Sequence, residues 1–424
     1  MKLNGKLSRR GRLATIMSLG IATIAIASVS TSFDPGTDQD PVIPLPCKVD
    51  FFEPGWNISV SRKMPEDVSA LLAVEDPSSF GDSVFVGTAP SGGVYRYNSS
   101  LPAATNSVAL GLGDRIENGT CAVSCLVVRD IDHDGTDELL AETCQITPAG
   151  RPRLYVWSLS NPVIPRGVAR PQINSSWSHG LGFLDRGTGR GESIFSTYCG
   201  HGEIVEFQLS RESSADGFQY ETLGWRKIGQ LPASGEGTQV IDVDNDGRLD
   251  VCLATGFAVG NAAIHVYSTS EFGIDLQPIH ILNEGNRFGN VKFKALELAG
   301  DAKTDVLAWW CTDLADGDCE VIRYQLGPNG LEQREVITHG DAGSLWPVDG
   351  QITRQDMEND GMSEVWFATT NGDLWRYDPS RQSVISRICH IGKTLGPICG
   401  APNSFDQTKG LYIGCGEFVL KLSR

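Results

Sequence analysis

A nine-residue acidic phrase occurs three times in this chain, at residues 130–138, 242–250 and 356–364. Each copy has acidic residues at positions 1, 3, 5 and 9 and glycine at position 6. Alternate carboxylates converge when the backbone curls, and glycine permits the sharp turn that closes the curl. Oxygen ligands at this spacing suit Ca²⁺, as in the first half of an EF-hand loop. Each copy runs into a β-rich apolar stretch, so the loops are predicted to join strands rather than helices.

The same repeats predict the metal ligands. An EF-hand needs a bidentate Glu at position 12, but here that position is Ala141, Leu253 or Phe367, so the acid at position 9 must complete the shell. In such loops position 7 contributes its backbone carbonyl. About three Ca²⁺ ions are expected, with the ligands Asp130, Asp132, Asp134, Thr136, Glu138, Asp242, Asp244, Asp246, Arg248, Asp250, Asp356, Glu358, Asp360, Met362 and Glu364. The alternative is three Asx-rich turns without metal, and the shared register of the copies argues against it.

A longer period runs through the chain. Strand–turn–strand text follows residues 82, 138, 192, 250, 305, 364 and 409, which are separated by 56, 54, 58, 55, 59 and 45 residues. A period in the fifties, made of short strands without long helical periodicity, is typical of a radial array of small sheets. The sequence therefore predicts seven such units and an all-β fold.

The chain resembles the FG-GAP/VCBS repeat family, the calcium-loop β-propellers that include the integrin α-subunit head. The resemblance rests on the loops and on Phe80-Gly81, residues 87–90 and residues 93–97, and it covers about residues 65–424. It implies a seven-bladed β-propeller of four-stranded blades, with each calcium loop joining the first and second strands of a blade on the bottom rim. Units 2, 4 and 6 keep the metal loop, units 3 and 5 have eroded versions, and units 1 and 7 show none.

The last unit lacks an outer strand, because the sequence stops after residues 418–422. The segment 56–62 lies upstream of the first inner strand, predicted at 68–74, and is available to supply that strand. We therefore expect the N-terminal strand to close the ring, which would leave no exposed blade edge at the joint.

The first residues have the pattern of an export signal. Five basic residues precede an uncharged run from Leu13 to Phe33, and residues 25–27 form a plausible cleavage site. The expected domains are a signal peptide at 1–27, a linker at 28–46 and the propeller at 47–424. Residues 8–13 resemble a twin-arginine signal, and an ordinary secretory signal or an uncleaved anchor are the alternatives. The predicted location is secreted, periplasmic or on the cell surface.

Charge limits the range of partners. Removal of residues 1–27 takes away five positive charges and no acids, so the net charge falls from −17 to −22. Such an acidic chain is not expected to bind nucleic acid or anionic membrane surfaces, both of which attract basic patches. The expected partners are carbohydrate or an extracellular protein.

All eleven cysteines follow the signal segment, which fits an oxidising compartment. Cys311 and Cys319 flank one predicted turn and are the preferred disulfide. Cys144 has Cys121 or Cys125 as a possible partner. A further group, predicted around the ring closure, comprises Cys389, Cys399, Cys415 and Cys47.

Ligand chemistry in propellers usually occupies the face opposite the calcium rim, where residues before each inner strand meet the loops between second and third strands. Aromatic rings beside charged groups suit sugars, whose apolar faces stack while their hydroxyls need hydrogen bonds. The binding candidates on that face are Trp177, Glu236, Trp310, Trp346 and Asp349. The catalytic candidates are His179, His201, Tyr198 and Arg287, and the two histidines are also candidates for a transition-metal site. Purely structural roles are the alternative for all nine.

Two functions remain open. The first is a non-catalytic extracellular binding or adhesion module stabilised by calcium. The second is a carbohydrate-active enzyme, a polysaccharide lyase or dehydratase, with its site on the face opposite the calcium loops. No phosphate-binding loop, G-x-S-x-G elbow or H-E-x-x-H zinc motif is present in the sequence.

Overall fold

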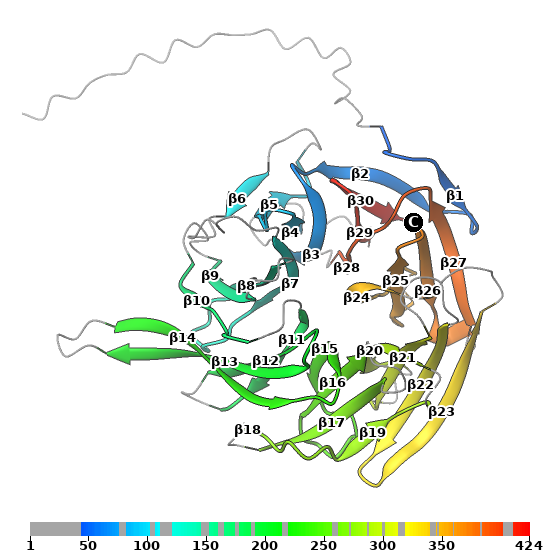
Figure 1. The fold of residues 1–424 in the computed structure, drawn as a ribbon. Helices are drawn as coiled ribbons and strands as arrows, with labels where there is room; N and C mark the ends of the chain where they lie inside the picture. The colour runs from blue at the N-terminus through cyan, green and yellow to red at the C-terminus, as the bar shows by residue number, and fades with distance from the viewer. Residues whose placement is uncertain are drawn as a thin grey trace, which may run out of the picture. The chain divides into compact units, whose positions relative to one another are not determined.

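The computed structural model describes residues 44–75, 82–101, 107–110, 121–145, 152–159, 165–173, 178–187, 191–213, 219–256, 262–270, 273–285, 288–298, 302–312, 319–339, 345, 347–358, 360–381, 384–401 and 410–424. These residues form a seven-bladed β-propeller of four-stranded antiparallel sheets, as the repeats predict (Figure 1). The described part of the chain contains no α-helix, and its one helical element is a 3₁₀ turn, η1 (Pro379–Arg381). It therefore also contains no helix long and apolar enough to cross a membrane.

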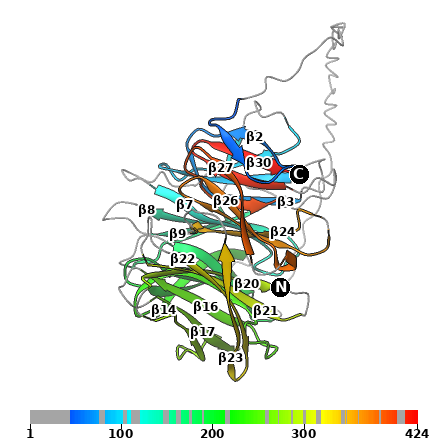
Figure 2. The same cartoon turned by 90° about the vertical axis from the view of Figure 1, so that its right-hand side faces the viewer.

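Each blade repeats one antiparallel order from the axis outward, and consecutive blades follow the ring in chain order (Figures 1 and 2). Blade 1 contains β3 (Asp67–Glu75), β4 (Asp82–Ala89), β5 (Val94–Asn98) and β6 (Val108–Leu110). Blade 2 contains β7 (Cys121–Arg129), β8 (Glu138–Gln145), β9 (Arg153–Ser158) and β10 (Gly167–Ala169). Blade 3 contains β11 (Ser178–Asp185), β12 (Glu192–Tyr198), β13 (Glu203–Ser213) and β14 (Gln219–Gln230). Blade 4 is β15 (Ser234–Ile241), β16 (Asp250–Gly256) and β17 (Ala263–Ser270), with β18 (Gly273–Ile274) and β19 (His280–Leu282) both paired to β17.

Blade 5 contains β20 (Asn290–Glu297), β21 (Thr304–Cys311), β22 (Cys319–Gly327) and β23 (Gly330–His339). Blade 6 contains β24 (Pro347–Gln355), β25 (Glu364–Thr369), β26 (Asp373–Tyr377) and β27 (Val384–Ile391). Blade 7 completes the ring with β28 (Ile398–Gly400), β29 (Gly410–Cys415), β30 (Phe418–Ser423) and β2 (Asn57–Lys63). The outer strands β23 and β27 also pair in parallel for two residues, which joins blades 5 and 6 at their outer edge.

Ring closure by the N-terminal strand is confirmed. β2 pairs antiparallel with β30 and becomes the outermost strand of blade 7, while β3 begins blade 1 immediately afterwards. Blade 7 is therefore built from both ends of the propeller. A further short strand, β1 (Val49–Phe51), pairs with β27 and adds a fifth strand to blade 6, which the sequence analysis does not anticipate.

The hydrophobic core lies between the blades. Seven clusters of buried side chains are present, and each joins two neighbouring blades. Second strands such as β16 and β25 are buried along their whole length because a neighbouring blade covers each face. This two-sided burial explains their continuous apolar text, since a strand with one wet face would alternate. Trp157, Trp366 and Trp375, which lie in second and third strands, are fully buried.

The cysteines lie close to where the sequence analysis expects them. Cys311 and Cys319 face each other as directly paired residues of β21 and β22, and both are thiols in this structure. Cys389 and Cys415 share the core cluster at the seam between blades 6 and 7, and Cys47 packs against it. Cys399 lies in the next cluster, between blades 7 and 1. A disulfide between Cys311 and Cys319 remains a prediction.

Candidate functional site

The three acidic loops occupy equivalent places, between the first and second strands of blades 2, 4 and 6. In blade 4 the carboxylates are ordered by the loop's own backbone: the Asp246 N–H donates to Asp242 Oδ1 (3.1 Å) and to Asp244 Oδ1 (3.2 Å). The Gly247 N–H donates to Asp242 Oδ2 (2.9 Å), and Gly247 has a φ of +89° that favours glycine.

The loops of blades 2 and 6 repeat this pattern. In blade 2 the Gly135 N–H donates to Asp130 Oδ2 (2.9 Å), and in blade 6 the Gly361 N–H donates to Asp356 Oδ2 (3.2 Å). Both glycines again have positive φ, +83° and +86°. Three loops distant in sequence therefore share the same hydrogen bond from the glycine N–H to the carboxylate at position 1.

The acid at position 9 is the first residue of the second strand in each of these blades, and it is buried. Its carboxylate accepts the backbone N–H of position 2, at 3.1 Å for Glu138 and Ile131, 3.1 Å for Asp250 and Val243, and 2.9 Å for Glu364 and Met357. Burial raises the pKa of Glu138 and of Asp250 to about 7, and that of Glu364 in the same direction. A cation beside these groups would oppose that shift.

Two of the loops have a geometry that fits a calcium ion. Carboxylate oxygens of Asp242, Asp244 and Asp246 lie within 4.8 Å of one another, and so do those of Asp130, Asp132 and Glu138. Opposite ligands of Ca²⁺ are about 4.6–5.2 Å apart at Ca–O distances of 2.3–2.6 Å, so each group can surround one ion. Thr136, Arg248 and Met362 occupy position 7, where a loop of this kind contributes a carbonyl oxygen.

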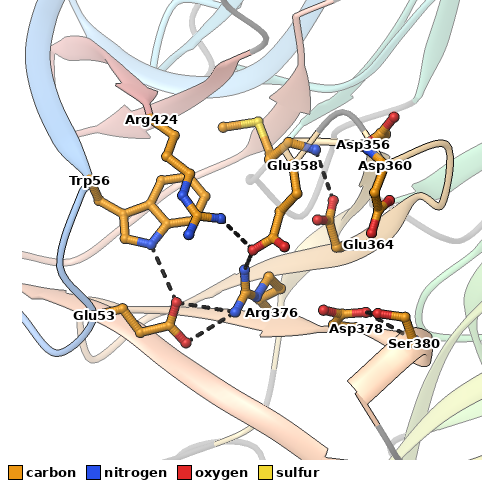
Figure 3. A network of polar contacts seen from close by, with 11 residues as sticks. Glu53, Trp56, Asp356, Glu358, Asp360, Glu364, Arg376, Asp378, Ser380 and Arg424 are labelled. Carbon is orange, nitrogen blue, oxygen red and sulfur yellow. Dashed lines mark hydrogen bonds and ion pairs between the residues drawn. The ribbon is translucent and has the colours of Figure 1, made fainter.

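The third loop differs because its position 3 acid, Glu358, points elsewhere. Arg376 Nη1 donates to Glu358 Oε1 (2.8 Å), and Arg424 at the C-terminus also donates to this oxygen. Figure 3 shows the Glu358 carboxylate turned toward these arginines and away from Asp356 and Asp360. Among the described residues, no metal-ligand group forms in blade 6. The three predicted sites are therefore not equivalent.

The other two loops also have basic side chains as neighbours. In blade 2 the Arg166 guanidinium bonds Asp132 Oδ2 (2.9 Å) and Glu138. In blade 4 the neighbour is an imidazole, with His280 Nε2 at 3.3 Å from Asp244 Oδ2. A guanidinium always carries its charge and competes with a metal ion, whereas an imidazole can be neutral. The loop of blade 4 is thus the one best arranged to accept Ca²⁺.

The centre of the ring holds a cavity of about 260 Å³. Residues along the middle of five inner strands, β7, β11, β15, β20 and β24, line it. Its lining includes the acidic and basic residues His179, Glu236, Lys292 and Lys294. Burial lowers the pKa of Lys294 and raises the pKa of the adjacent Cys125 thiol to about 12. The cavity is therefore a polar, cation-containing site within an acidic protein.

Four side chains from three blades meet beside this cavity, and we call His179, Cys199, Glu236 and Lys292 the axial cluster. His179 Nε2 lies 2.8 Å from Cys199 Sγ and 3.6 Å from Glu236 Oε2. Lys292 Nζ donates to Glu236 Oε2 (3.1 Å) and lies 3.3 Å from His179 Nδ1. His179, Glu236 and Lys292 are each buried, and Cys199 is half-buried.

β-Bulges in two inner strands direct the side chains of His179 and Glu236 toward the cluster. The pairing of β15 with β16 shifts register between Gly235 and Gly237, so Glu236 is an extra, unpaired residue. The pairing of β11 with β12 shifts likewise between Ser178 and Leu181, a stretch that contains His179. Bulges redirect side chains and are frequent beside functional sites. Gly256 leaves the space that Glu236 occupies, because a Cβ there would lie 2.6 Å from Glu236 Cγ.

The axial cluster contains two predicted site residues and two that sequence reasoning missed. Glu236 is paired with Lys292, one of the two residues that were missed. The repeat contains the missing signal: His179, Glu236 and Lys292 precede the anchors 192, 250 and 305 by 13, 14 and 13 residues. Aligning the units on their anchors would have identified Lys292. Cys199 directly follows Tyr198 and has no such signature.

Two further candidates that the structure describes lie outside this cluster. Trp310 is fully buried against Phe288 and Tyr324, which fits the structural alternative for this residue. His201 lies in the exposed turn between β12 and β13, where its carbonyl oxygen accepts a hydrogen bond from Gln230 (2.9 Å). Trp177, Arg287 and Trp346 lie outside the described residues, as does the Asp349 side chain.

Tyr198 is fully buried and is not among the residues that line the cavity. Its hydroxyl donates to Glu142, a fully buried carboxylate in β8, and Ser196 Oγ donates to the same group at 3.1 Å. Burial raises the pKa of Tyr198 well above its usual value and the pKa of Glu142 to about 7. This pair bridges blades 2 and 3, and the four catalytic candidates are not assembled into one site by the described residues.

Comparison with known proteins does not extend these observations. No model of a known protein family matches the chain, and no curated protein sequence gives a significant match.

Proposed function

We propose that this protein is an exported, calcium-stabilised propeller of the FG-GAP/VCBS type that binds carbohydrate at the mouth of its axial cavity. The observation that supports this most directly is the separation of two sites along the inner strands. Acidic loops follow the ends of β7, β15 and β24, whereas the cavity residues His179, Glu236 and Lys292 lie near the starts of β11, β15 and β20. One rim would hold the metal ions and the other would be free for a ligand.

Calcium in this proposal is structural. Several carboxylates held within one short loop repel each other unless a cation lies between them, so metal binding and folding are linked. We assign Ca²⁺ to the loops of blades 2 and 4, and a third ion of lower affinity to blade 6, where Glu358 must first leave Arg376.

Thermal unfolding tests the calcium proposal. The midpoint of unfolding should fall in EDTA and recover with Ca²⁺ much better than with Mg²⁺, which demands a smaller octahedral shell. Native mass spectrometry should find two ions at low calcium and a third at higher concentration. An unchanged midpoint in EDTA, or a metal-free protein in millimolar calcium, would exclude the proposal.

A glycan array tests the binding proposal. The cavity's polar groups include the ammonium of Lys292, so the calcium-loaded protein should retain glycans, acidic ones above all, and Lys292→Met should weaken retention about tenfold. Lys303→Met is the matched control, because Lys303 lies directly before β21, outside the cavity lining, in an exposed pair with Glu332. Retention of no glycan, or equal losses in both variants, would contradict binding at this cavity.

A further inference from the structure

The axial cluster has the composition of a transition-metal site, which goes beyond the calcium loops and the proposed binding function. An imidazole nitrogen, a thiol sulfur and a carboxylate oxygen, from His179, Cys199 and Glu236, lie within 4.8 Å of one another. Calcium prefers oxygen ligands, whereas nitrogen and thiolate sulfur are ligands of Zn²⁺. The two kinds of metal-ligand group in this protein therefore have different chemistry and lie at different ends of the inner strands.

We propose that His179, Cys199 and Glu236 bind one Zn²⁺ ion, with the fourth coordination position open to the axial cavity. Zinc with ligand distances of 2.0–2.3 Å in a tetrahedron holds its ligand atoms about 3.4–3.6 Å apart. Each Glu236 oxygen is at 3.6 Å from one of the other ligands, Oε2 from His179 Nε2 and Oε1 from Cys199 Sγ. Only the 2.8 Å separation of His179 and Cys199 has to widen, by less than about 1 Å.

The fold supports this site from three directions. His179 and Glu236 are aimed by separate bulges in β11 and β15, and Cys199 is held at the end of β12. The Cys199 thiol already has the Gly235 carbonyl oxygen at 3.4 Å. Two ligands on inner strands and a third directly after β12, from two adjacent blades, form a preorganised site, which is what high metal affinity requires.

The proposed ion would balance the negative charge of ligands that are largely shielded from water. The Glu236 side chain is 1 % exposed and the His179 side chain 4 % exposed. A Cys thiolate and a Glu carboxylate together offset the charge of Zn²⁺, so the bound site is neutral. When Nε2 binds the metal, Nδ1 carries the ring proton, so Lys292 moves off the imidazole and keeps its bond to Glu236 Oε2.

The open position determines the class of ligand. Three protein ligands plus one free position are the arrangement of zinc sites that bind water or a substrate, whereas structural zinc sites are closed by four protein ligands. His179, Glu236 and Lys292 all line the cavity, so a ligand of the metal can enter from it. The Lys292 ammonium beside the free position favours an anionic ligand such as a carboxylate.

Metal titration of the full protein, without an affinity tag and in millimolar calcium to fill the acidic loops, tests this proposal. We expect one Zn²⁺ per chain by elemental analysis and by calorimetry. Co²⁺ in its place should give the near-ultraviolet charge-transfer band of a cobalt–thiolate bond. Cys199→Ser should abolish that band, and Cys199→Ser and His179→Ala should each weaken zinc binding by about 100-fold or more.

Cys125→Ser is the matched control, because Cys125 lines the same cavity but is not a member of the axial cluster. It should leave the band and the zinc affinity unchanged, as should Asp242→Asn in the calcium loop of blade 4. Unchanged thermal midpoints in calcium show that the Cys199, His179 and Cys125 variants are folded. The proposal would be overturned if the protein bound no zinc outside the calcium loops, or if the cobalt band persisted in Cys199→Ser. Equal losses of zinc affinity in Cys199→Ser and Cys125→Ser would overturn it as well. None of these outcomes affects the calcium-dependent unfolding midpoint on which the proposed function depends.

Discussion

At the scale of single residues, the buried acids of this propeller have two different roles. Glu138, Asp250 and Glu364 belong to the acidic loops, where a metal ion would compensate their charge. Glu142 lies between blades 2 and 3 and is surrounded by hydroxyl groups of Ser196 and Tyr198. Hydroxyl groups donate hydrogen bonds but bring no positive charge, so burial dominates and raises the pKa of Glu142 to about 7.

Glu142 should therefore make the protein less stable as the pH rises. The folded state keeps the Glu142 proton up to about pH 7, while the unfolded chain releases it near pH 4.5. Between these values the free energy of unfolding should fall with pH by up to about 1.4 kcal/mol per unit. Urea unfolding at pH 5 and pH 7.5, in saturating calcium, should show a smaller difference in Glu142→Gln than in the wild-type protein. Equal differences in the two proteins would contradict this assignment.

At the scale of the loop and its two strands, the position 9 acid persists where the metal loop does not. In blade 5 Asp305 is fully buried, accepts the Leu298 N–H (3.3 Å) and pairs with Arg323 (2.7 Å). The position 9 acid, in the turn between the first and second strands, is thus paired with an arginine in blade 5 and, in our proposal, with calcium in blade 4. The acid is part of the blade's construction, and the metal is an addition to it.

The two acids should differ in their response to calcium. Asp250→Asn should remove the stabilisation from one ion, which is about 2.7 kcal/mol at free calcium 100 times the dissociation constant, and should change little in EDTA. Asp305→Asn should cost about 2–3 kcal/mol in calcium and in EDTA alike, because it weakens a charged hydrogen bond that contains no metal. Chemical unfolding of both variants in both conditions measures this. The same calcium dependence in both would refute the distinction.

The elements also show what the sequence could and could not predict. The acids at 82, 138, 192, 250 and 364 each begin the second strand of a blade, as predicted. They could be predicted because a carboxylate directly before an apolar strand is easy to recognise in the sequence. The axial cluster was only half predicted, since its geometry depends on bulges in β11 and β15 that alternation of residue types does not reveal. The direction of Glu358 was equally hidden, because its partner Arg424 is 66 residues away. Contacts between distant segments decide such details.

At the scale of the whole ring, the two ends of the propeller are joined by charge as well as by strand pairing. Arg376 in β26 is 1 % exposed and bonds Glu358 and also both oxygens of Glu53 (3.0 and 3.1 Å). Glu53 precedes β2, and Arg424, next to Glu358, ends the chain (Figure 3). The buried Arg376 guanidinium therefore links blade 6 to the segment before β2, and Glu358 links the same blade to Arg424.

Arg376→Gln should destabilise the ring strongly. It leaves Glu53 and Glu358 without their buried partner, and breaking such an ion pair costs about 3–5 kcal/mol. Arg334→Gln is the matched control, since Arg334 bonds Glu284 (2.6 Å) but is 38 % exposed and should cost below about 1 kcal/mol. Urea unfolding in saturating calcium compares them. Equal losses would show that the link across the seam contributes no more than a surface pair.

The seam also sets the order of events during biosynthesis. β2 is synthesised before the other strands of blade 7 and its partner β30 after them, so blade 7 can be completed only once β30 has been made. Until then β2 has an unpaired edge that other chains could occupy. The ring therefore closes at blade 7, after all strands of the other six blades have been made.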